Sequence, residues 1–251
     1  GISMDLQYFK STTDDMFNMY SAVFRETMIF DSESMLTYLH ALTGPRHRVL
    51  VPEDPRFLDH YLADGILDTN YNKINEDWVV AGSLHDFPSE TRAGMMSALL
   101  SLPYEFRMVT RYRAFSRDKA KSMLKGFQKS YFSRRKGVGA ILTETVSKEQ
   151  TQLEDPEALA MTEEVASAIE SMSGGELFFG ELTTSIIVRD KSRKRALQAL
   201  TAIRKEINER GFIVKEEKLN TTGVFLGSIP GNFDINDRRP ILSSQNLAHF
   251  F

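Results

Sequence analysis

Cysteine is absent from these 251 residues. The chain therefore has neither disulfides nor thiolate ligands for zinc or iron–sulfur clusters, and a reducing, cytoplasmic compartment is the simplest expectation. Long apolar runs are also missing. No stretch approaches the ~18 apolar residues of a membrane span, and the N-terminus lacks the basic-then-apolar pattern of a secretory signal. The sequence predicts a protein that does not cross a membrane unaided.

Motifs for nucleotide, metal and acyl-transfer chemistry are missing as well. Nucleotide-binding motors of the common type need Gly-x-x-x-x-Gly-Lys-Ser/Thr, because its backbone N–H groups and lysine hold the phosphates. No window of the sequence matches, the five histidines are scattered, and no Gly-x-Ser-x-Gly elbow is present. We predict no catalytic, cofactor-binding or metal-ligating residue in this chain.

The net charge of −3 argues against attraction of the whole molecule to nucleic acid, so any basic site must be local. One basic region stands out at residues 107–136. It could be a nucleic-acid groove, face an anionic membrane, or bind an acidic partner; it could also be a solvated helix face balanced by acids elsewhere. Its candidate interaction residues are Arg107, Arg111, Arg113, Lys121, Lys125, Lys129, Arg134 and Arg135.

Hydrophobic periodicity predicts an alternation of helices and strands. The expected helices are two within residues 1–46, then 55–66, one beginning at Ser89, 116–136, 155–173 and one that Asp190 caps and Gly211 ends. The expected strands are 47–52, 78–84, 105–115, 176–188, 212–217 and 222–226, and residues 137–154 form a polar connector. In the strand at 105–115, Arg107, Arg111 and Arg113 share one face.

The repeated strand–helix–strand plan predicts an α+β fold with mainly antiparallel sheets and helices packed on one face. We expect an N-terminal helical segment at 1–46, of which residues 1–3 precede Met4 as an expression remnant, and two ferredoxin-like halves at 47–150 and 151–251. The segment from Pro230 to Pro240 is a poor helix or strand, and it predicts a hinge or packing loop.

The order of short motifs is more specific than any single one. Gly227-Ser228-Ile229-Pro230-Gly231-Asn232 is followed by Arg238-Arg239-Pro240 and by Ser243-Ser244-Gln245-Asn246-Leu247-Ala248. Upstream lie Asp86-Phe87-Pro88 and Leu102-Pro103-Tyr104-Glu105-Phe106-Arg107. This order, over about residues 75–251, resembles the CagE/TrbE/VirB family of conjugation-type ATPases of type IV secretion systems, with TrbE-like members most similar.

The resemblance implies the N-terminal half of a cytoplasmic motor whose phosphate-binding loop, with ATP and Mg²⁺, lies further along in a RecA-like domain. It implies a docking and assembly role at the bacterial inner membrane for conjugative DNA or protein transfer. The expected partners are inner-membrane and motor subunits, the ATPase domain, and further copies in a hexamer. The residues that mark the family form a hinge toward the motor, which we expect to be mobile without it: Gly227, Pro230, Gly231, Asn232, Arg238 and Asn246. The alternative function is a nucleic-acid-binding module that uses residues 107–136.

Overall fold

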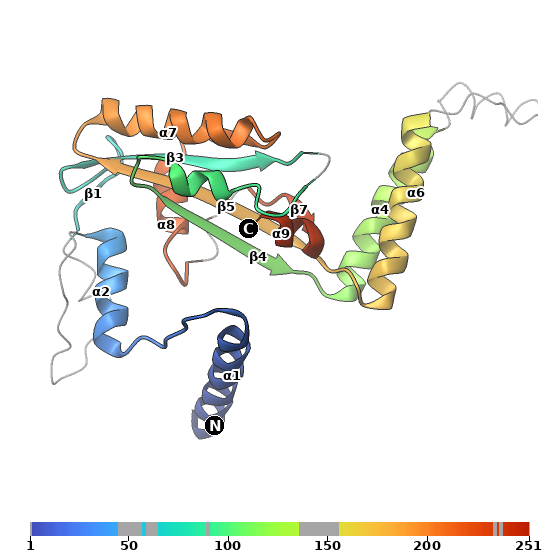
Figure 1. Cartoon of the computed structure of the whole chain (residues 1–251), viewed down its shortest axis with the longest axis horizontal. Coiled ribbons are helices and arrows are strands. Elements are labelled where there is room, and N and C mark those ends of the chain that lie inside the picture. Colours follow the sequence, from blue (N-terminus) through green and yellow to red (C-terminus); the bar gives the residue numbers. More distant parts are fainter. Residues whose placement is uncertain are drawn as a thin grey trace, which may run out of the picture. The chain divides into compact units, whose positions relative to one another are not determined.

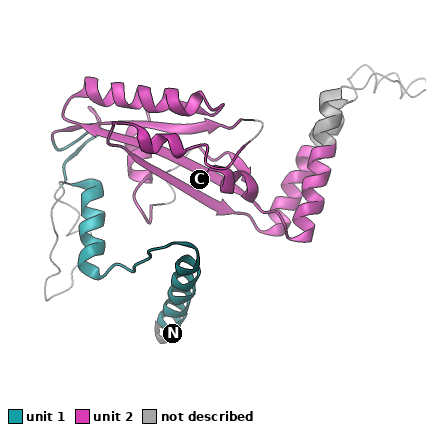
Figure 2. Ribbon diagram, viewed as in Figure 1, with its two compact units in different colours: residues 1–68, 73–75 teal, residues 69–72, 76–251 magenta. Residues whose placement is uncertain are grey.

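The structure is a computed structural model that describes residues 2–44, 57–58, 65–88, 91–135, 156–232, 235 and 238–250. It divides into two compact units, one of residues 1–68 and 73–75 and one of residues 69–72 and 76–251 (Figure 2). The predicted strand at 47–52, most of the predicted helix at 55–66 and the connector at 137–154 lie outside the described residues.

The first unit contains the two predicted N-terminal helices, α1 (Ile2–Val23) and α2 (Ser32–Thr43). Asp31 caps α2, since its side chain accepts a hydrogen bond from the Ser34 N–H at 2.7 Å. Two short strands follow, β1 (Leu67–Asp68) and β2 (Lys73–Ile74), and they pair antiparallel. The prediction of an N-terminal helical segment is confirmed.

The second unit is built on an antiparallel sheet in the order β6, β3, β5, β4 (Figure 1). Its strands are β3 (Asp77–Asp86), β4 (Arg107–Ala114), β5 (Phe179–Asp190) and β6 (Ile213–Glu216), and β7 (Ile241–Ser243) pairs with the start of β5. The seven consecutive residues Leu182–Val188 of β5 are all buried. A strand buried on both faces suits the centre of a sheet, and β5 does pair with β3 on one edge and with β4 on the other.

The α+β class and the mainly antiparallel sheet are confirmed. The arrangement differs from the two predicted ferredoxin-like halves. The strands of both halves belong to a single sheet, and along the chain its elements follow a βαββαβ succession. β5 from the second plan lies between β3 and β4 from the first. The physical reason is the burial of β5 from Leu182 to Val188, because a buried backbone needs a hydrogen-bonded neighbour along both edges.

The main core lies between one face of the sheet and α7 (Arg193–Asn208), which buries Leu200, Ile203 and Ile207. Gly82 of β3 makes this close packing possible, since a Cβ there would lie 3.1 Å from Val214 and 3.3 Å from Leu200. Ser192, and not the predicted Asp190, caps α7.

The helix predicted to begin at Ser89 is a turn followed by the short 3₁₀ helix η1 (Ser97–Ser101). Gly94 explains the difference, because its φ of 72° is incompatible with a continuous α-helix. Residues 89–90 lie outside the described part. Met96 and Leu99 are buried in the main core, whereas Ala93 and Leu100, which the predicted helix would place on the same face, are exposed.

The opposite face of the sheet packs against α8 (Thr221–Gly227), where the sequence predicted a strand at 222–226; that prediction is wrong. Val224 and Phe225 are both buried although they are adjacent, a pattern that a helix lying on the sheet allows and a half-buried strand does not. Tertiary packing therefore overrides the β-propensity of these residues.

The remaining helices of the second unit are α4 (Arg117–Arg135), α6 (Pro156–Gly174) and α9 (Ser244–Phe250). The α4 and α6 helices pack against each other through Ala120, Leu124 and Met172 (Figure 1). Across the part of the chain that the structure describes, helices long and apolar enough to span a membrane are absent.

Candidate interaction site

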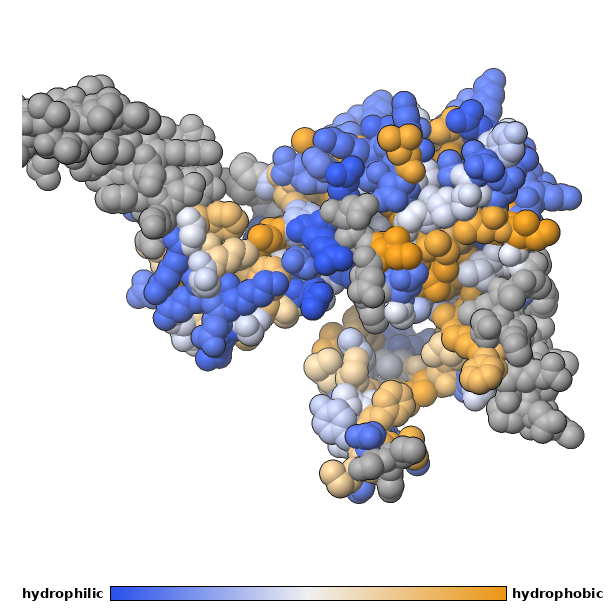
Figure 3. All heavy atoms as spheres, turned by 180° about the vertical axis from the view of Figure 1, so that it is seen from behind, coloured by the Kyte–Doolittle hydropathy of each residue, from blue (hydrophilic) through white to orange (hydrophobic). Residues whose placement is uncertain are grey.

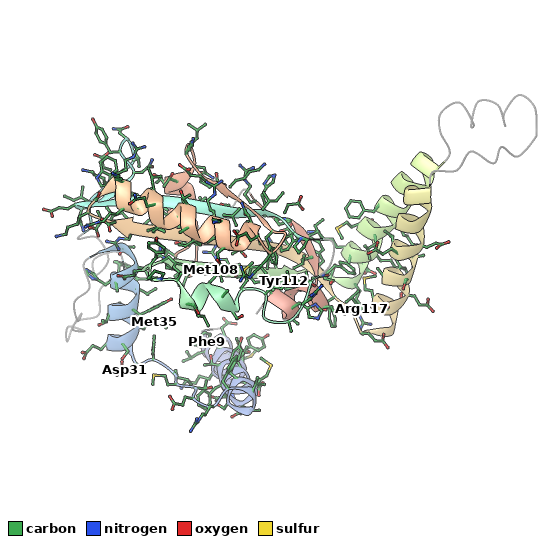
Figure 4. All side chains as sticks on the ribbon, turned by 45° about the horizontal axis from the view of Figure 1, so that its top comes forward. Phe9, Asp31, Met35, Met108, Tyr112 and Arg117 are labelled. Atoms are coloured by element: carbon green, nitrogen blue, oxygen red, sulfur yellow. The ribbon has the colours of Figure 1, made fainter. Side chains whose placement is uncertain are left out.

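Alternate residues of β4 point to opposite faces of the sheet. Met108 and Tyr112, labelled in Figure 4, pack against the main core, and the Tyr112 hydroxyl donates to the Leu242 carbonyl at 3.2 Å. Burial raises the pKa of the Tyr112 hydroxyl. Arg107 and Arg111 therefore lie on the other face, the one that α8 covers.

Both arginines bind the segment that leaves α8. The Arg107 guanidinium donates to the Ser228 hydroxyl at 2.6 Å and lies 5.2 Å from the centre of the Phe225 ring. Arg111 donates to the Asn232 carbonyl at 2.7 Å and to the Ile229 carbonyl at 3.1 Å. We call this set of contacts the arginine clamp. It joins two distant parts of the sequence on one face of the sheet.

The clamped segment is a turn whose residue types fit its backbone. Asn232 N–H donates to the Ile229 carbonyl at 3.2 Å, with Pro230 and Gly231 between them. Gly231 has a φ of 88°, so proline followed by a left-handed glycine gives the pattern of a type II turn. Asn232 also donates from its side chain to the Leu226 carbonyl at 3.2 Å. The turn is therefore fixed both to α8 and to β4.

The electrostatics of the clamp are favourable. The last carbonyls of a helix carry partial negative charge, and Arg107 and Arg111 bring cations to the C-terminal end of α8. Burial lowers the pKa of the Arg111 guanidinium, although arginine stays charged at neutral pH. Hydrogen bonds from a charged donor are stronger than neutral ones, which suits an anchor at a half-buried site.

Arg238 and its neighbours are fastened along the edge of β5. The Thr183 hydroxyl donates to the Arg238 carbonyl at 3.0 Å, and the Arg238 guanidinium pairs with Glu217 at 3.3 Å. Glu217 is buried, so this ion pair offsets the cost of removing a carboxylate from water. The Leu182 N–H donates to the Pro240 carbonyl at 2.9 Å. These contacts count against a mobile hinge at residues 228–232 and 238–240.

Asn246 lies in α9 and joins a separate polar group. Its backbone N–H donates to Ser243 Oγ at 3.2 Å, which caps α9, and its side chain donates to Thr91 Oγ1 at 3.0 Å. Thr91 Oγ1 lies 2.9 Å from His249 Nδ1. The group links α9 to the segment before η1 and has no contact with the arginine clamp among the hydrogen bonds of the described residues.

The remaining basic candidates do not join the clamp. Arg113 is exposed at the end of β4, and Lys121 and Lys125 are exposed along α4. Lys129, Arg134 and Arg135 belong to α4, but their side chains lie outside the described part. The predicted basic region is thus divided into an internal clamp and an exposed stripe on α4.

The structure brings together Arg107, Arg111, Gly227, Pro230, Gly231 and Asn232 from the predicted residues. Sequence reasoning missed Phe225 as a partner of Arg107, because a strand was expected at 222–226. It also missed Glu217 as a partner of Arg238, because local pattern does not reveal pairing between distant segments. The Pro-Gly pair within the motif was the available signal for a tight turn. Groups of three or more His, Asp or Glu side chains that could hold a metal ion are absent from the residues that the structure describes.

Comparison with known proteins gives a consistent result. A family model described as "CagE, TrbE, VirB family, component of type IV transporter system" matches residues 23–155 and 134–238. A probable conjugal transfer protein TrbE from Sinorhizobium fredii is 28% identical over 208 residues, which cover 82% of this chain and 31% of that protein.

Two further relatives agree with this match. The conjugal transfer protein TrbE of Rhizobium radiobacter is 27% identical over 207 residues, covering 82% of this chain and 25% of that protein. The type IV secretion system protein virB4 of Bartonella quintana is 22% identical over 236 residues, covering 92% of this chain and 27% of that protein. The matches thus span about a quarter to a third of these relatives' length.

Proposed function

Because this chain belongs to the CagE, TrbE, VirB family of type IV transporter components, we propose that it is a docking and assembly domain that catalyses no reaction of its own. The chain is TrbE-like and belongs to the type IV secretion ATPase family. We propose that the whole protein hydrolyses ATP to energise the transfer of DNA or protein, and that this region positions it.

The observation that carries the proposal is the arginine clamp. A domain that positions a motor has to hold the segments that connect the domain to the motor in a defined place. Arg107 and Arg111 do this by fixing residues 228–232 to β4, with hydrogen bonds of 2.6 to 3.1 Å. The chain's own turn occupies the face of the sheet that carries Arg107 and Arg111, which supports a positioning role.

We place the binding of ATP and Mg²⁺ outside these 251 residues, because no part of the sequence has the spacing of a phosphate-binding loop. The exposed stripe on α4, with Lys121 and Lys125, is the surface that we assign to an acidic partner. The partners we propose are inner-membrane and motor subunits, and further copies in a hexamer. The proposed location is the cytoplasmic side of the bacterial inner membrane.

The test is a conjugation assay in which a full-length relative carrying this region complements a deletion. Charge reversal of Lys121 and Lys125 to glutamate should lower transfer by about tenfold or more, because it removes the electrostatic complement of the partner. The matched control reverses Arg193 and Lys194, which are also exposed but lie on α7. Equal losses in both double variants, or measurable ATP hydrolysis by the purified 251-residue chain, would contradict the proposal.

Nucleic-acid binding through residues 107–136 is the alternative function. The clamp weakens it, since Arg107 and Arg111 already bind a hydroxyl and backbone carbonyls of the same chain. Arg113, Lys121 and Lys125 remain available to phosphates. Fluorescence anisotropy with labelled single- and double-stranded DNA distinguishes the two functions. Affinity that falls steeply with salt and with charge reversal of Lys125 would favour the alternative.

A further inference from the structure

The α1 helix carries a heptad pattern that the proposed function does not explain. Apolar residues recur at alternating steps of three and four residues, and a single threonine interrupts them: Leu6, Phe9, Thr13, Met16, Tyr20 and Val23. Alternating steps of this kind define the a and d positions of a coiled coil and align the residues along one seam of the helix. Here Leu6, Thr13 and Tyr20 take a, and Phe9, Met16 and Val23 take d.

This seam is exposed in the described structure. Leu6 is 56%, Phe9 66% and Val23 75% exposed, and Figure 3 shows orange and pale orange spheres along α1. Phe9 is labelled on α1 in Figure 4. Phe17 falls at a flanking e position and Met19 at a flanking g position, which widens the apolar stripe. Apolar stripes of this length on a soluble helix mark an interface.

Thr13 fits the seam in spite of its hydroxyl. The hydroxyl donates to the Phe9 carbonyl at 2.9 Å within the same helix. A hydroxyl that is already hydrogen-bonded can be buried at little cost, and the threonine methyl then faces the seam. The whole stripe from Leu6 to Val23 can therefore be covered.

Charged residues beside the seam identify the occupant. In a parallel pair of helices, a g residue faces the e residue five positions later on the partner helix, and opposite charges there set orientation and partner choice. Asp5 takes g and Lys10 takes e. In an in-register parallel pair of identical helices, Asp5 of each copy faces Lys10 of the other. Two-fold symmetry forms this ion pair twice.

We propose that α1 binds α1 of a second copy of this chain as a parallel, in-register coiled coil. The polar side of α1 argues against a membrane surface as the occupant. It carries Asp14 and Asp15, whereas helices that lie on anionic membranes carry lysine and arginine on that side. The inference does not depend on the proposed docking function, because it rests only on the seam and charges of α1.

Cysteine cross-linking of the 251-residue protein tests the register, and the native sequence contributes no cysteine of its own. Leu6→Cys at an a position should form a disulfide-linked dimer under mild oxidation, because a parallel in-register pair brings the two sulfurs within bonding geometry. Ser11→Cys, at an outward f position of the same helix, is the control. Cross-linking of Leu6→Cys should be about tenfold faster or more. Equal rates for the two variants would overturn the proposal.

Sedimentation velocity over about a hundredfold range of protein concentration tests the association itself. Met16→Asp should weaken self-association by about tenfold or more because it places a charge in the seam, whereas Asn18→Asp adds the same charge at an f position and should leave it unchanged. A monomer at every concentration would overturn the proposal and indicate that α1 packs within its own chain. If Met16→Asp does not weaken self-association, the interface lies elsewhere and the proposal is overturned as well.

Charge exchange provides a check that does not alter the apolar seam. Asp5→Lys and Lys10→Asp should each weaken self-association, because each places like charges opposite one another in both copies. The double variant should restore it, and a mixture of the two single variants should form hetero-dimers in preference to homo-dimers. Loss that the double variant does not restore would refute the parallel register.

Discussion

Replacing Arg111 with alanine removes two hydrogen bonds that a charged donor makes to the Asn232 and Ile229 carbonyls, at 2.7 and 3.1 Å. Hydrogen bonds to charged groups contribute ~1.5–3 kcal/mol each to stability. Burial of the guanidinium, which lowers the pKa of Arg111, offsets part of that gain. Both carbonyls belong to a half-buried turn that water can reach in the variant. We therefore expect Arg111→Ala to lower the free energy of unfolding by about 2–3 kcal/mol.

The assay is urea denaturation followed by the fluorescence of Trp78, which is the chain's single tryptophan and lies in β3 of the second unit. With a denaturant slope of ~1–3 kcal/mol/M, the midpoint should fall by about 0.7–3 M. Hydrogen exchange gives a local readout. The Asn232 amide, which is bonded to the Ile229 carbonyl, should exchange faster in the variant because the turn loses its anchor to β4.

The matched control is Arg113→Ala, which removes an exposed arginine from the same strand and should change stability by no more than about 0.5 kcal/mol. Arg111→Lys should fall between the two, because lysine keeps the charge but cannot reach two carbonyls with a planar fork. If Arg111→Ala destabilises the protein no more than Arg113→Ala does, the clamp does not anchor the turn and the reasoning fails.

Three further outcomes can be checked with the same purified protein. Gly231→Ala should destabilise the protein by about 1–2 kcal/mol, because the φ of 88° at Gly231 is unfavourable for a residue with a side chain. Gly126→Ala in α4, where a Cβ meets open space, should stabilise it by about 0.5–1 kcal/mol. Urea denaturation measures both changes. Leu200→Ala should cost ~2–5 kcal/mol by the same method, since its side chain is 1% exposed and contacts the sheet. The hydrogen bond from Arg195 holds the pKa of Asp190 below its ordinary value. Its stabilisation of the folded state is therefore present above about pH 3.9 and is lost as the pH falls through the lower folded-state pKa. NMR titration should show that the pKa of Asp190 rises in Arg195→Ala.

Local pattern was enough for most helices and strands. The period-two alternation at 105–115 predicted β4, and the strand predicted at 176–188 is present as β5. The Pro-Gly pair at 230–231 predicted a loop, and the order of short motifs predicted the family, which the comparisons confirm. These features are short in range, so neighbouring residues decide them.

Pairing between distant segments could not be read in this way. The sequence placed Arg107 and Arg111 on one strand face and left open whether that face binds a partner or is solvated. Only the three-dimensional structure shows that α8 and its turn cover it. The strand expected at 222–226 became a helix for the same reason, because packing against β3 and β5 outweighs intrinsic propensity.

The amino-acid sequence alone was sufficient for the α+β class and the family, because composition, periodicity and motif order all lie in the linear chain. The folded structure was needed to establish which strands are neighbours and which of the basic residues remain exposed. Strand order depends on contacts between residues about a hundred positions apart, as when β5 inserts between β3 and β4. A charge on a strand gives no sign of the segment that will cover it, so the arginine clamp became visible only in three dimensions.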